Sequence, residues 1–108
     1  MEKNLIQQGD VLFFEENNLP ESIKKVKSKN GYLIFAEGET TGHFHGVLEE
    51  DACELFEDEH GTLWCKVAGE IDVKHQEHKP VTLKEGVYRI GIVREVDPFA
   101  EEIRSVRD

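Results

Sequence analysis

The chain has 108 residues, of which 38% are hydrophobic and 33% are charged, and its formal net charge is −10. These values predict one small soluble domain over residues 1–108, and they argue against a long nucleic acid as a partner, because such a partner requires a basic face. A small anionic ligand in a local pocket stays possible. No apolar run has membrane-spanning length and the amino terminus lacks a signal-peptide layout, so we expect a cytoplasmic protein that does not contact a membrane.

The first half of the chain alternates short apolar runs with turn signals. Gly9-Asp10 predicts a turn before a buried strand at residues 11–14, and Asn30-Gly31 predicts a tight turn before a strand at 32–35. Between these strands, residues 21–29 have too small an apolar face for a helix, so we interpret them as a loop. A loop with two glycines and two threonines at residues 36–42 leads into a strand at 43–49.

The second half of the chain predicts five further strands, at residues 53–57, 62–67, 71–74, 81–83 and 87–96. A turn at residues 58–61 contains His60, to which we assign no chemistry. In the last strand Arg94 lies on an otherwise apolar face and should have an anionic partner. Residues 99–106 predict a short C-terminal helix. The whole pattern predicts an all-β fold, a small barrel or sandwich of about seven to nine short antiparallel strands.

Four of the five histidines lie in two short segments of the sequence. His43 and His45 are two residues apart in a predicted strand, so their side chains share one face. His75 and His78 form the second pair, with Lys79 directly behind. The plain interpretation is that these are surface residues. Clustered imidazoles are costly unless something uses them, however, so we favour a shared functional site.

A metal site is one interpretation of the histidine pairs. An HxH pair on a strand with a later histidine resembles the cupins, in which a carboxylate completes the site; Glu49 or Glu50 would take that place, with His75 or His78 as the third imidazole. Such ligands suit Zn, Fe, Mn or Ni. The downstream glycine of the cupin motif is missing here. Cys53 and Cys65 are too far apart for a CxxC pair and predict free thiols packed in the core.

Acid–base chemistry without a metal or other cofactor is the interpretation that we favour. Cleavage of RNA next to its own 2′-hydroxyl requires one imidazole to remove the 2′ proton, another to protonate the leaving 5′ oxygen, and a cation to stabilise the charge on phosphorus. Histidine suits both roles because its pKa of ~6.5 lies near neutrality. The candidate catalytic residues are therefore His43, His45, His75, His78 and Lys79.

Three blocks of the sequence carry a resemblance to a known group of proteins: residues 36–45, residues 75–80 and residues 94–99. Together they resemble small proteins of bacteria, phages and plasmids that we associate with the dimeric ring nucleases of type III CRISPR systems. The resemblance covers most of the chain from Gly9 onward. It implies a homodimer that degrades cyclic oligoadenylate second messengers, and a phage-encoded copy would act as an anti-CRISPR.

Five further residues beside the histidines are predicted to bind this substrate: Thr40, Thr41, Gly42, Glu77 and Arg94. An alternative without catalysis is an interaction module from a mobile element. Its contact surface would be the acidic segment 49–59, which holds seven acidic residues and no basic one.

Overall fold

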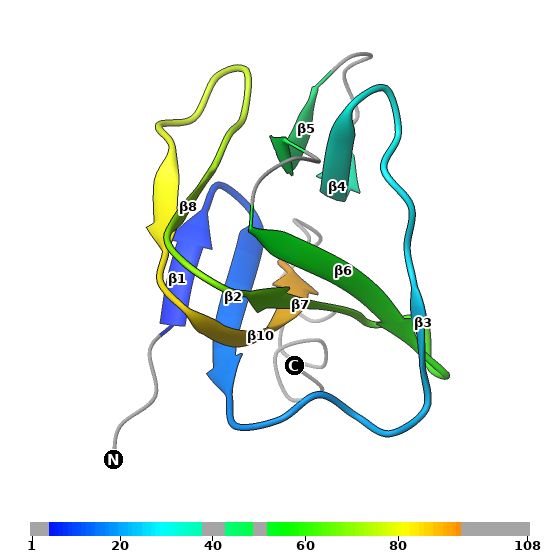
Figure 1. The fold of residues 1–108 in the computed structure, drawn as a ribbon. Helices are drawn as coiled ribbons and strands as arrows, with labels where there is room; N and C mark the ends of the chain where they lie inside the picture. The colour runs from blue at the N-terminus through cyan, green and yellow to red at the C-terminus, as the bar shows by residue number, and fades with distance from the viewer. Residues whose placement is uncertain (1–4, 38–42, 49–51, 94–108) are drawn as a thin grey trace, which may run out of the picture.

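The computed structural model describes residues 5–37, 43–48 and 52–93, and this part of the chain is all β, as predicted (Figure 1). It contains no helix that is long and apolar enough to cross a membrane. Ten strands are present in the described residues: β1 (Leu5–Gln8), β2 (Val11–Glu16), β3 (Ile23–Lys25), β4 (Tyr32–Glu37), β5 (Phe44–Leu48), β6 (Cys53–Asp58), β7 (Leu63–Val67), β8 (Ile71–Val73), β9 (Val81–Leu83) and β10 (Gly86–Ile92).

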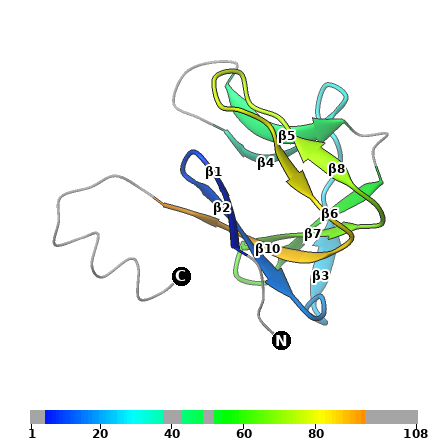
Figure 2. The same ribbon diagram turned by 90° about the vertical axis from the view of Figure 1, so that its left-hand side faces the viewer.

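The strands form one large sheet and two hairpins. The main sheet is antiparallel, with six strands in the order β1-β2-β10-β7-β6-β3, and the hairpins are β4-β5 and β8-β9. The two hairpins meet where Gly46 of β5 and Lys74 pair through an isolated bridge. Figure 2 shows β5 and β8 close together, as this bridge requires. No sheet among the described strands closes on itself, so the barrel form of the prediction is not observed.

The core lies between the main sheet and the two hairpins. Inward side chains alternate with outward ones along β2, β7 and β10, as expected for strands with one buried face. Phe13 of β2 meets Phe35 of β4 edge to face, with ring centroids 5.4 Å apart. Each fully buried aliphatic or aromatic side chain of this kind stabilises the fold by about 1.5–3 kcal/mol.

Two strands differ from the sequence prediction. The loop predicted for residues 21–29 is wrong at Ile23–Lys25, which pair with β6 as the edge strand β3. Lys25 lies 3.3 Å from Glu54 of β6, so a cross-strand ion pair accompanies this pairing, although isolated surface pairs contribute little. No element was predicted for β1. Both strands are short, and each is paired with a neighbouring strand of the main sheet.

Most of the remaining predicted strands and turns are confirmed. Asn30 and Gly31 have φ angles of 53° and 85°, which suits the tight turn predicted from that dipeptide. The last strand ends at Ile92 within the described residues, whereas the prediction extended it to residue 96. Arg94 and the predicted helix at residues 99–106 lie outside the described residues.

Gly46 of β5 pairs with Ile34 of β4 on one side and with Lys74, after β8, on the other. A Cβ atom built on Gly46 would lie 2.7 Å from the carbonyl oxygen of Leu33 and 3.1 Å from the Phe44 ring. Gly46→Ala is therefore expected to lower the free energy of unfolding by about 1–3 kcal/mol, the usual cost of overpacking, as measured by urea unfolding. Gly69→Ala is the matched control, since its new Cβ would meet only Ala52 at 4.0 Å. An equal loss in both variants would contradict this account.

Candidate histidine site

The two histidine segments converge at one place in the fold. The ring centroids of His45 and His75 are 4.3 Å apart, and those of His75 and His78 are 4.6 Å apart. His43 lies 5.6 Å from His75, edge to face, and His78 stacks on His45 at 6.0 Å with an angle of 17° between the rings. We call these four residues the histidine cluster. His75 touches all three of its other members.

Backbone hydrogen bonds bring the two segments together. The N–H of Gly46 donates to the carbonyl of Lys74 at 3.0 Å, and the N–H of Lys74 donates to the carbonyl of Gly46 at 2.8 Å. Two residues before Gly46, the N–H of Phe44 donates to Oε1 of Gln76 at 2.7 Å. These bonds hold the start of β5 against residues 74–76. His45 of β5 therefore lies beside His75.

The side chain of Gln8, at the end of β1, hydrogen-bonds residues on both sides of this contact between β5 and residues 74–76. Its side chain is buried, with 2% exposed, and its Nε2 donates to the carbonyls of Val73 and Lys79 at 2.9 Å each. Both amide protons are therefore used, and the Oε1 atom is left facing Nδ1 of His45 at 2.8 Å. One side chain thus connects β1, β5 and both ends of the segment that carries His75 and His78.

The orientation of the Gln8 amide determines the tautomer of His45. Because Oε1 of Gln8 can only accept, Nδ1 of His45 must carry a proton, and the lone pair of the neutral ring is on Nε2. That Nε2 lies 3.4 Å from Oδ1 of Asp10. Burial, followed by the neighbouring His75, lowers the pKa of His45 to about 4, although the carboxylate of Asp10 opposes this. His45 is therefore neutral at physiological pH.

His75 organises the turn that carries the second pair. Its Nδ1 accepts the backbone N–H groups of Glu77 at 3.0 Å and His78 at 3.2 Å. In its neutral form the ring consequently has its proton on Nε2. Burial and the nearby His78 lower the pKa of His75. Two adjoining neutral rings explain how the cluster packs closely without repulsion between imidazolium charges.

His78 is the exposed member of the histidine cluster, His43 and His75 are part-buried, and His45 is buried. The side chain of His43 is 24% exposed, and its Nδ1 lies 3.9 Å from Oε1 of Glu77. His78 is exposed and lies over Gly9, where an added Cβ would come within 2.6 Å of its Nε2. Gly9 also has a φ of +58°, a conformation that other residues rarely adopt. A glycine at this turn therefore gives the His78 ring room to pack.

The other predicted site residues are placed only in part. Glu77 lies beside the cluster, and Lys79 follows it with its carbonyl bonded to Gln8. Thr40, Thr41, Gly42 and Arg94 lie outside the described residues, as do Glu49 and Glu50 of the cupin-like alternative. Within the described ranges, no group of three or more histidine, cysteine or carboxylate side chains is arranged to hold a metal ion. Cys53 and Cys65 are free thiols, the second fully buried.

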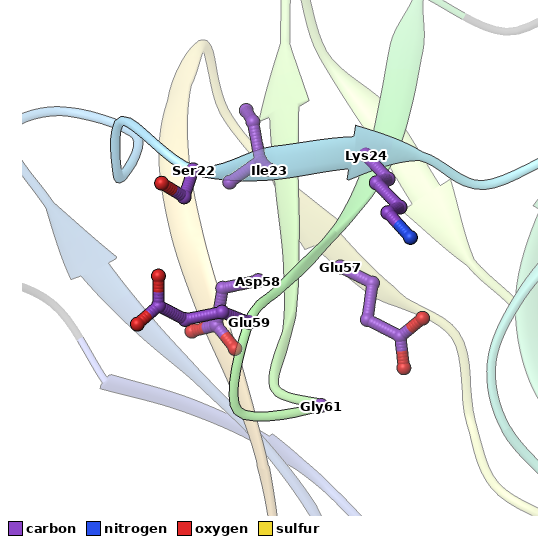
Figure 3. Close-up of a pocket in the computed structure, with 7 residues that line it drawn as sticks. All are labelled: Ser22, Ile23, Lys24, Glu57, Asp58, Glu59 and Gly61. Carbon is purple, nitrogen blue, oxygen red and sulfur yellow. The ribbon is translucent and has the colours of Figure 1, made fainter.

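A separate hollow, which no member of the histidine cluster lines, lies between β3 and the turn after β6 (Figure 3). Asp58, in its lining, is already engaged, since it accepts hydrogen bonds from the N–H groups of His60 and Thr62 and from Nε1 of Trp64. These bonds lower the pKa of Asp58 against the opposing effect of burial. Most other charges in the lining are carboxylates, so this hollow does not suit an anionic ligand.

Sequence reasoning missed Gln8 and Asp10. Both lie next to Gly9 at a turn that was recognised, but β1 was not. In a predicted β1, Gln8 would share the inward face with Ile6, and an inward glutamine requires hydrogen-bond partners. That alternation was the available signal. The identity of those partners, 37 to 71 positions away in the sequence, was beyond any local pattern.

Comparison with known proteins gives one match. The model of a family described as a domain of unknown function, DUF8820, matches residues 7–93. This range includes Gln8, Asp10 and all four members of the histidine cluster. No curated protein and no solved structure matches the chain.

Proposed function

We propose that this chain, which belongs to the DUF8820 family, cleaves a phosphodiester bond of cyclic oligoadenylate by acid–base catalysis without a metal ion. The observation that best supports this proposal is the convergence of four imidazoles, with ring centroids 4.3–6.0 Å apart in four pairs. The two segments that carry them are distant in the sequence and meet only through tertiary pairing. A cluster of this kind offers both a proton acceptor and a proton donor near neutral pH.

The reaction needs only proton transfers and charge stabilisation. One imidazole takes the proton of a ribose 2′-hydroxyl while the 2′ oxygen bonds to phosphorus. The bond between phosphorus and the 5′ oxygen breaks, and a second, protonated imidazole gives its proton to that oxygen. The products are a 2′,3′-cyclic phosphate and a 5′-hydroxyl. Lys79, directly after the cluster, is the cation proposed to stabilise the charge on phosphorus.

The direct test incubates purified protein with cyclic tri-, tetra- and hexa-adenylate and separates the products by chromatography. We expect at least one ring to be opened to linear fragments. If all three rings remain intact at stoichiometric protein concentration, the ring-nuclease proposal is wrong. Where cyclic oligoadenylate is opened, a phage origin of the gene would extend the proposal to an anti-CRISPR role, because loss of the second messenger ends the signal.

Excess chelator is expected to leave the cleavage rate unchanged, since proton transfer by imidazole requires no Lewis acid. The observation that favours a metal-binding alternative is the bond from His45 Nδ1–H to Gln8 Oε1, because metal-ligating histidines commonly donate their second N–H in this way. Elemental analysis distinguishes the two. Stoichiometric zinc, iron, manganese or nickel together with activity lost on its removal would favour the alternative.

A homodimer with two-fold symmetry is the expected assembly. A chain of 108 residues offers a small concave surface, and a cyclic oligonucleotide has rotational symmetry that a two-fold dimer can match. Light scattering at micromolar concentration should give about twice the chain mass of 12.4 kDa. A monomer under these conditions would count against the symmetric substrate site.

A further inference from the structure

We propose that the four histidines divide by role: His43 and His78 touch the scissile phosphodiester, whereas His45 is a buried positioning residue. This inference rests on the proposed function, because it names which residues of that same site meet the substrate. It differs from the sequence interpretation, in which all four were equivalent catalytic candidates. The division follows from exposure and from the hydrogen bonds that each ring already makes.

His45 is closed to a substrate. Only 4% of its side chain is exposed, and its Nδ1–H is used by Gln8. Its other nitrogen faces the carboxylate of Asp10 at 3.4 Å, and the rings of His75 and His78 pack against it. A ribose hydroxyl would have to displace one of these neighbours to reach Nε2. His45 instead provides a neutral ring against which the rings of His75 and His78 pack.

His75 is less buried than His45, and it holds the turn that carries His78. Its Nδ1 already accepts two backbone N–H groups, including that of His78, so rotation of the His75 ring would undo the turn that places His78. We therefore assign His75 to positioning as well. Its remaining Nε2–H contributes a neutral donor near the site.

His43, which is part-buried, and His78, which is exposed, are left as the rings proposed to meet the substrate. His43 enters from the start of β5 and His78 from the segment before β9, and each contacts His75. The acid and the base of a phosphodiester cleavage must act on two different oxygens of one phosphate, so two accessible rings on separate segments meet the requirement. One takes the 2′ proton and the other supplies the proton for the 5′ oxygen.

Gln8 is the residue on which this arrangement depends. It is the only described side chain seen to bond His45 and both ends of the segment that carries the second pair. The side chain of its neighbour Gln7 is exposed and donates to the carbonyl of Gly9. Gln7 is therefore a matched control for any change made at Gln8.

The kinetic test compares His45→Asn with His78→Ala over a range of pH. The side-chain amide of the introduced asparagine can donate to Gln8 as Nδ1–H does, but it cannot carry a proton in the reaction. We expect His45→Asn to keep kcat within about tenfold of wild type and to keep both limbs of the pH–rate profile, whereas His78→Ala loses at least ~100-fold and one limb. A loss of a limb in His45→Asn would overturn the positioning role.

A second measurement does not depend on activity, and its first part uses only the wild-type protein. Nitrogen-15 NMR of the wild-type histidines at pH 7 should show His45 as a single tautomer with its proton on Nδ1. Gln8→Leu should lose that fixed tautomer while Gln7→Leu keeps it. If His45 carries its proton on Nε2 in the wild type, the proposed hydrogen bond from His45 Nδ1–H to Gln8 Oε1 is wrong. If the tautomer is as expected but no cyclic oligoadenylate is cleaved, the bond between His45 and Gln8 stands. The proposed function and the division of roles are then both wrong.

Discussion

His43→Ala and His78→Ala are each expected to lower the rate of cyclic oligoadenylate cleavage by at least ~100-fold, the lower end for loss of a general acid or base. The two rings are accessible and meet at His75, so removing either leaves the reaction without its proton acceptor or its proton donor. The expected loss lies mainly in kcat, because proton transfer happens in the transition state. Single-turnover assays with the ring that the wild type cleaves best will measure it.

His60→Ala is the control for this experiment. His60 lies in the turn after β6 with 79% of its side chain exposed, away from the histidine cluster, so its loss should leave the rate unchanged. Circular dichroism of each variant must match the wild type, since an altered fold would lower the rate for another reason. If His43→Ala and His78→Ala cleave as fast as the wild type, the activity is real and the histidine cluster is not its site.

Acidification is expected to destabilise the protein between pH 6.5 and pH 4 more steeply than carboxylates alone would. The pKa of His45 is lowered from 6.5 to about 4 by burial, then by His75, with His78 acting in the same direction and Asp10 opposing both. The unfolded chain therefore binds more protons than the folded chain in this window. Stability from His45 is fully present above pH 6.5 and is lost as the pH falls toward 4.

The size of this effect follows from the difference between the two pKa values. Each pKa unit corresponds to about 1.4 kcal/mol, so His45 contributes up to about 3 kcal/mol at neutral pH. The lowered pKa of His75 adds in the same direction. Urea unfolding at four pH values from 7.5 to 4.5 will measure the slope. His45→Asn should flatten it and His60→Ala should leave it unchanged; an unaltered slope in His45→Asn would show that other groups are responsible.

Local patterns in the sequence were enough to predict the class of the fold and most of its elements. Apolar side chains at alternate positions of the predicted strands 62–67 and 87–96 indicated one buried face in each, and the structure buries Cys65, Val67, Tyr88 and Ile90 there. Asn30-Gly31 predicted its turn because few other dipeptides tolerate two positive φ angles. These are local signals. Each depends on residues within a few positions of one another, which is why sequence alone was enough.

The sequence also predicted that His43 and His45 share a face, and it marked His75 and His78 as a second group. How the two groups meet, and which of the rings is buried, became visible only in the folded chain. Gly46 pairs with Lys74, and Gln8 binds His45, Val73 and Lys79, across separations of 28 to 71 positions. Hydrogen bonds over such distances depend on how strands are ordered in space. Because local patterns carry no information about that order, the buried His45 and the proposed catalytic pair could be told apart only in the folded chain.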